Sequence, residues 1–79
     1  MEQKLRRNNT LGQNMQGLRR AAGLTQAQTA ARLQVQGLDI SREILSQMES
    51  GRYNIPVPVL KALKELYKAE SYDEFFQGL

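Results

Sequence analysis

Apolar side chains recur along this chain only at helical spacing. Leu11, Met15 and Leu18 lie four and three residues apart, so they share one face of a helix, and Ala22 extends the same stripe. No segment alternates apolar and polar residues with period two, which is the pattern of a half-buried strand. The sequence therefore predicts an all-α protein.

Cap residues and glycines divide the chain into five short helices. The predicted helices begin near Thr10, Gln26, Arg42, Pro58 and Tyr72, and the first three end at Gly23, Gly37 and Gly51. Thr25 and Gln28 have the spacing of a capping box, as do Ser71 and Glu74 before the last helix.

Each predicted helix has an inner face. The inward residues are Ala27, Ala30, Ala31 and Leu33 on the second helix, Leu45 and Met48 on the third, and Val59, Leu60, Leu63, Leu66 and Tyr67 on the fourth. Gly12 and Gly17 weaken the first helix by ~1 kcal/mol each relative to Ala. We therefore expect tertiary contacts to hold that helix in place.

The composition excludes several kinds of site. The chain has no Cys and no His, which removes most zinc sites, a Cys nucleophile and a His general base. It also lacks a glycine-rich phosphate loop, so we expect no enzyme, no metal, no cofactor and no small-molecule ligand. No stretch approaches the ~18–20 apolar residues of a membrane span, and the N-terminus lacks the apolar region of a signal peptide. A cytoplasmic, nucleoid-associated protein is expected.

Charge is unevenly distributed. The formal net charge is +3 and the isoelectric point is near 9.6. Residues 1–54 carry a balance of +4 and residues 55–79 a balance of −1. A basic front favours a polyanionic partner, although a mildly basic solvated surface is the alternative.

A more specific pattern runs from the first predicted helix to the third. Its parts are Leu18-Arg-Arg-Ala-Ala-Gly-Leu-Thr-Gln26, Ala30-Ala-Arg-Leu33, Ile40-Ser41 and Ser46-Gln-Met-Glu-Ser-Gly51. In this order they resemble the Cro and phage-repressor type of helix-turn-helix, the XRE family, over residues 11–76. The resemblance implies a compact five-helix, lambda-repressor-like domain over residues 10–79, preceded by a flexible polar arm at 1–9. The connection between the second and third helices is longer here than is usual in the family, and an added turn ending at Gly37 would absorb most of it.

The resemblance implies that the third helix enters the major groove of DNA. The base-reading positions then fall on Arg42, Glu43 and Gln47. Their chemistry suits that role, because Arg binds guanine, Glu accepts from cytosine and Gln pairs with adenine. Solvated side chains on an exposed helix are the alternative for all three.

Other residues match positions that hold the phosphate backbone in the family. The predicted phosphate contacts are Thr25, Gln26, Ser41, Ser46, Arg52, Tyr53 and Asn54. Thr25 and Ser41 are also predicted helix caps, and an ordinary solvated loop is the alternative for residues 52–54. Arg6 and Arg7 are candidate arm contacts, with a solvated tail as the alternative.

Two further predictions concern structure and assembly. The family pattern pairs Arg19 with Glu49, the alternative being two independent surface charges. Regulators of this type pair on symmetric half-sites, so we expect a homodimer, at least on DNA. Apolar side chains near the C-terminus would form its contact unless they cover the core. These are Tyr72, Phe75, Phe76 and Leu79.

The function predicted from these features is sequence-specific binding of double-stranded DNA by a transcriptional regulator, with repression the expected direction. The alternative is a protein-interaction module or antitoxin partner that keeps the fold with weak or no DNA binding. Glu43 supports that alternative, because a carboxylate in the groove repels phosphates.

Overall fold

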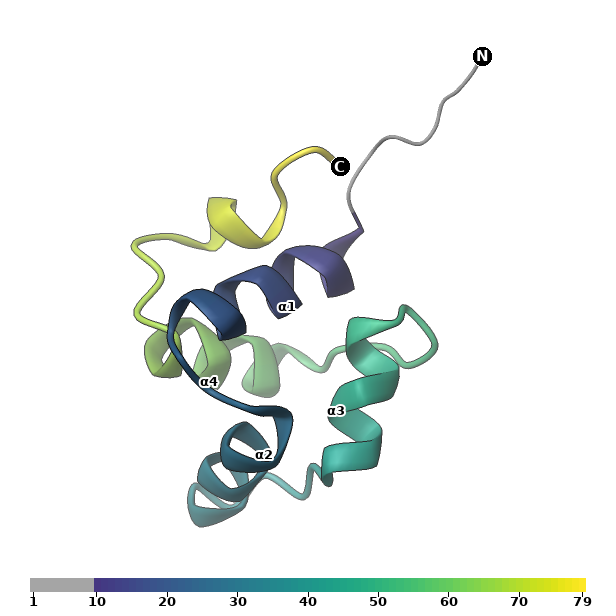
Figure 1. The fold of residues 1–79 in the computed structure, drawn as a ribbon, viewed down its shortest axis with the longest axis vertical. Coiled ribbons are helices and arrows are strands. Elements are labelled where there is room, and N and C mark those ends of the chain that lie inside the picture. The colour runs from purple at the N-terminus through teal and green to yellow at the C-terminus, as the bar shows by residue number, and fades with distance from the viewer. Residues whose placement is uncertain (1–9) are drawn as a thin grey trace.

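The computed structural model describes residues 10–79, and within them it is all-helical with no strand (Figure 1). The helices are α1 (Leu11–Ala21), α2 (Gln26–Val35), α3 (Arg42–Glu49) and α4 (Val57–Leu66), followed by the 3₁₀ helix η1 (Tyr72–Phe75). The predicted all-α class is confirmed. The predicted arm, with Arg6 and Arg7, lies outside the described residues.

Polar caps start the first three helices. The Thr25 amide donates to Gln28 Oε1 at 2.9 Å, and the Gln28 amide donates to Thr25 Oγ1 at 3.0 Å, so the predicted capping box is present. Thr10 and Gln13 form a second box, which was not predicted. The Ser41 hydroxyl accepts from the Ile44 amide at 3.1 Å and caps α3.

Left-handed residues follow the helix ends. Gly23, Gly37 and Gly51 follow α1, α2 and α3 with φ of +76°, +85° and +83°, as predicted. Lys68 takes the same place after α4 with φ of +58°, and the Ala69 amide then donates to Lys64 O at 3.0 Å. The longer connection therefore begins with the glycine that ends α2.

The core lies where α1, α3 and η1 meet the pair α2–α4. Figure 1 shows α1 crossing the molecule, with η1 in yellow on one side of it and α2 and α3 on the other. The largest fully buried side chains are Phe75, Met15, Leu33, Leu45, Met48, Leu63 and Thr29. The helices that carry the helix-turn-helix pattern thus share one core with the C-terminal segment.

The predicted inner face of α2 was partly wrong. Ala27 and Ala31 are exposed, whereas Thr29 is fully buried beside Ala30. The inner face is centred on residues 29, 30 and 33, and the outer alanines are simply small residues on a solvated surface. Ala22 is also exposed, because it lies at the C-cap of α1, where the stripe has ended.

The predicted last α-helix and its capping box were wrong in detail. The segment is a four-residue 3₁₀ helix, and the Ser71 hydroxyl accepts from the Asp73 amide, two residues along, at 3.2 Å. The Glu74 carboxylate accepts from the Glu70 amide rather than from Ser71. A tertiary contact holds this end: the Asn14 side-chain amide donates to the carbonyl oxygens of Phe75 and Gln77 at 2.9 and 2.8 Å.

Candidate nucleic-acid interface

The start of α3 is positioned by the connection from α2. The Gln34 side-chain amide reaches across this connection and donates to Ile40 O at 3.0 Å. Ile40 is buried and Leu38 is half-buried, so the connection is attached to the core by apolar contacts as well. These contacts fix where Ser41 caps α3.

The end of α3 lies directly against the backbone of α1. A Cβ atom added to Gly12 would lie 2.5 Å from the carbonyl oxygens of both Met48 and Glu49. Any side chain at this position would force the two helices apart. Gly12 weakens α1 by helix propensity, but its lack of a side chain lets α1 and α3 approach so closely.

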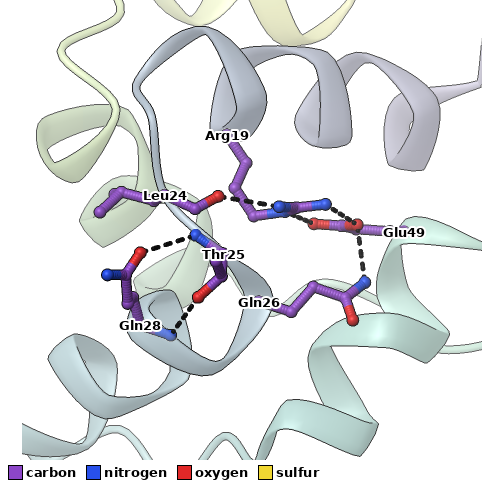
Figure 2. Close-up of polar contacts among 6 residues, drawn as sticks. All are labelled: Arg19, Leu24, Thr25, Gln26, Gln28 and Glu49. Carbon is purple, nitrogen blue, oxygen red and sulfur yellow. Dashed lines mark hydrogen bonds and ion pairs between the residues drawn. The ribbon is translucent and has the colours of Figure 1, made fainter.

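A buried ion pair joins the same two helices (Figure 2). Arg19 Nε donates to Glu49 Oε2 at 2.7 Å, and Arg19 Nη2 donates to Glu49 Oε1 at 3.2 Å, which is the bidentate arrangement. The Arg19 and Glu49 side chains are only 9% and 2% exposed, so they are not independent surface charges. Arg19 Nη1 donates to Leu24 O at 2.8 Å, and this ties in the loop before α2 as well.

Gln26 extends the ion pair to α2. Its Nε2 donates to Glu49 Oε1 at 3.0 Å, and Figure 2 shows its side chain reaching from the first turn of α2 toward α3. We call Arg19, Glu49 and Gln26, with the Leu24 carbonyl, the ion-pair cluster. It connects all three helices that carry the helix-turn-helix pattern.

The electrostatics favour the charged form of Arg19. The hydrogen bond to the Glu49 carboxylate raises the pKa of Arg19, and burial offsets only part of that rise. The guanidinium and carboxylate charges cancel each other. The cluster therefore orients the helices and adds no net charge to the surface.

The outer face of α3 is polar and exposed. Arg42, Glu43, Ser46 and Gln47 all lie on it, while Leu45, Met48 and Glu49 point inward. Arg42 and Ser46 are four residues apart, as are Glu43 and Gln47, so each pair is adjacent on the helix surface and the three predicted base-reading side chains lie together with Ser46. The structure brings these residues together, and their roles on DNA remain predictions.

Five of the seven predicted phosphate contacts form two groups, while Ser41 caps α3 and Ser46 lies on its outer face. Thr25 and Gln26 lie at the start of α2, where each also makes a structural hydrogen bond. Arg52, Tyr53 and Asn54 are exposed in the loop after α3. Tyr53 and Asn54 line a shallow cleft with Thr10–Gly12, so this loop lies beside the start of α1.

Two polar residues of α1 lie at the candidate site but were not predicted from the sequence. Gln16 and Arg20 line a cleft with Thr25, Gln26 and Arg42. Arg20 lies next to the buried Arg19 and three residues before Gly23, so on a helix it faces outward near the end of α1. This outward-facing place for Arg20 could have been predicted from its spacing to Arg19 and Gly23.

No helix within residues 10–79 has the length and apolarity needed to cross a membrane. The same residues contain no group of three or more side chains suited to holding a metal ion.

Comparison with known proteins gives one match. A family model described as a helix-turn-helix domain matches residues 10–74, which include all four α-helices and most of η1. No curated protein and no solved structure matches the chain.

Proposed function

Because this chain belongs to a family of XRE-like helix-turn-helix domains, we propose that it recognises a specific sequence of double-stranded DNA and represses transcription there. Such domains bind DNA and regulate transcription. The observation that carries the proposal is the exposed polar face of α3. A buried, bidentate ion pair holds α3 against α1, and the Gln26 hydrogen bond connects it to α2. A reading helix needs this kind of fixed orientation.

The residues divide by chemistry. Arg42, Glu43 and Gln47 on α3 read base edges in the major groove, because each presents the donors or acceptors that distinguish base pairs. The following hold phosphates: Thr25, Gln26, Ser41, Ser46, Arg52, Tyr53 and Asn54. The protein acts by binding alone in the cytoplasm, at the nucleoid, with no catalytic step and no cofactor.

Selection of bound sequences from a random duplex pool, at two salt concentrations, tests the proposal. We expect an enriched, two-fold-symmetric site. Arg42→Ala should then weaken binding to that site by ~1–3 kcal/mol and relax selectivity at one base pair. Arg32→Ala, an exposed arginine on α2, is the control that should leave selectivity unchanged. The proposal fails if no sequence is enriched.

A homodimer on DNA is the proposed assembly. Phe75 is fully buried and covers the core, whereas Tyr72, Phe76 and Leu79 are 41%, 45% and 59% exposed. These three side chains leave apolar surface at the C-terminal end for a two-fold contact. Sedimentation should show two copies on one symmetric duplex, and one copy both free and on that duplex would reject the dimer.

One observation favours a second function, a protein-interaction module or antitoxin partner. Glu43 lies exposed in the first turn of α3, where a carboxylate repels phosphates. Glu43→Gln separates the two functions. If Glu43 reads cytosine, the variant should bind a broader set of sequences. If Glu43 only repels DNA, the variant should bind every duplex more tightly by the same factor.

A further inference from the structure

A cleft of about 600 Å³ opens where the end of α1 meets the starts of α2 and α3. Its polar lining comprises Gln16, Arg19, Arg20, Thr25, Gln26 and Arg42. Three of these six side chains are arginines, and no carboxylate of residues 10–79 is among the residues that line the cleft. The cleft is therefore positively charged.

Within residues 10–79, two of the three arginines have no carboxylate partner. The charge of Arg19 is matched by Glu49. Arg20 on α1 and Arg42 on α3 are exposed, and within the described part of the chain neither forms an ion pair with a carboxylate. Two like charges on one cleft repel each other, although Arg20 also lies favourably in the last turn of α1. An anion from outside the chain would remove that repulsion.

We propose that Arg20 clamps one phosphate of the DNA backbone in this cleft, next to Arg42. The proposal rests on the proposed function and extends the DNA contact to α1, beyond the helices expected to bind. A guanidinium presents parallel N–H donors that match two phosphate oxygens. Arg42 lies on both the cleft and the polar face of α3. A phosphate held by Arg20 would therefore fix how far Arg42 reaches toward the bases.

The cleft offers further donors to the same phosphate. Gln26 Nε2 carries two hydrogens, and Glu49 accepts one of them, so the second is free to donate. The Thr25 hydroxyl accepts from the Gln28 amide and keeps its own hydrogen for donation. Both groups are already held in place by the fold. The site therefore needs little rearrangement to bind.

Arg20→Gln tests the clamp through the salt dependence of binding. Each neutralised phosphate contributes about 0.9 to the slope of log K against log salt. We expect the Arg20→Gln slope to be lower by about one unit, with the same fold-loss of affinity on the selected site and on mismatched duplexes. Arg32→Gln removes another exposed arginine, from α2 and outside this cleft, and should keep the wild-type slope. Matching melting midpoints for the two variants would establish that both are folded.

Neutral methylphosphonates, placed one at a time along the duplex, then locate the phosphate. Wild-type protein should lose affinity at each contacted position, and Arg20→Gln should be insensitive at one of them. An unchanged slope and an unchanged position pattern for Arg20→Gln, with wild-type protein still binding its site, would overturn the clamp alone. Wild-type protein that binds no duplex would instead overturn the proposed function, and the clamp with it.

Discussion

Two groups of polar side chains are buried in this small core, and they differ in their hydrogen bonding. In the ion-pair cluster, all three guanidinium nitrogens of Arg19 donate a hydrogen bond, Glu49 Oε2 accepts one and Glu49 Oε1 accepts two. The second group, which we call the hydroxyl pair, consists of Thr29 on α2 and Tyr67 at the C-cap of α4. Both are buried, at 0% and 5% exposure, and neither hydroxyl has a hydrogen-bond partner among the described residues.

The difference shows which of the two buried polar groups supports the proposed function. The ion-pair cluster connects α1, α2 and α3, so it fixes the direction of the helix that we propose reads DNA. The hydroxyl pair lies between α2 and α4, where the Arg19 and Glu49 charges still act on the Tyr67 hydroxyl, and each unpartnered buried hydroxyl costs about 1–3 kcal/mol. Thr29 is close enough to lower the pKa of Tyr67 and so to offset part of the rise due to burial, but the two hydroxyls do not meet hydrogen-bond geometry. We therefore expect opposite responses when the two groups are altered.

The largest effect should come from Glu49→Gln. This change removes the counter-charge and leaves the Arg19 guanidinium buried and unneutralised, which costs ~3–5 kcal/mol. Denaturant unfolding measures the loss. Glu65→Gln is the control, because Glu65 is exposed on α4 and should change stability by less than ~0.5 kcal/mol. An unchanged unfolding midpoint for Glu49→Gln would mean that the ion-pair cluster does not hold α3.

Gly12→Ala tests the backbone contact beside the same cluster. The new Cβ would meet two backbone carbonyl oxygens at 2.5 Å, so α1 and α3 must separate, and we expect a loss of ~1–3 kcal/mol. Gly17→Ala is a matched control in the same helix, since nothing lies within 4 Å of its added Cβ. That variant should gain ~1 kcal/mol from helix propensity. If both alanines stabilise the protein, the close approach at Gly12 is not required.

The ion-pair cluster and the hydroxyl pair also differ in how much of each could be predicted from the sequence. The fold class, the three glycine ends and the pairing of Arg19 with Glu49 could be predicted, because caps are local and the ion pair belongs to a family pattern. The role of Gly12 could not, since helix propensity counts only its cost and the benefit comes from residues 48 and 49. The burial of Thr29 depends on how α2 packs against α4, and no local pattern carries that information.

The candidate site shows the same limit. Its polar residues on α3 followed from helical spacing, but the cleft shared by Arg20 and Arg42 requires the arrangement of three helices. The last helix was predicted as α-helical because Ser71 and Glu74 have capping-box spacing. In the structure, Asn14 binds two carbonyl oxygens of that segment, a contact across more than sixty residues. Local spacing cannot anticipate such a contact.

The next effect is a loss of stability at alkaline pH that depends on Tyr67. Burial raises the pKa of Tyr67 to about 12, above the value near 10 of an unfolded chain. The stabilisation from this difference is fully present below pH ~10 and is lost as the pH rises toward 12, because only the unfolded state ionises in that window. At pH 11.5 wild-type protein should have lost ~1–2 kcal/mol more than Tyr67→Phe, relative to pH 9.

Unfolding by denaturant at both pH values measures that difference. Tyr53→Phe is the control, because Tyr53 is exposed in the loop after α3 and should not change the alkaline loss. Equal losses in wild-type protein and Tyr67→Phe would show that the phenol is hydrated in the folded state.

The smallest effects should come from removing the hydroxyl pair at neutral pH. Thr29→Val and Tyr67→Phe each replace an unpartnered hydroxyl while keeping most of the side-chain shape, and Thr and Val have similar helix propensities. We expect each to be neutral or stabilising by up to ~1 kcal/mol, in contrast to Glu49→Gln. Since the two hydroxyls are not bonded to each other, the double variant should equal the sum of the singles within ~0.5 kcal/mol. A double-mutant cycle by denaturant unfolding measures this. If each single change destabilises the protein and the cycle shows a coupling above ~1 kcal/mol, the hydroxyls do bond to each other, and the contrast between the two buried groups disappears.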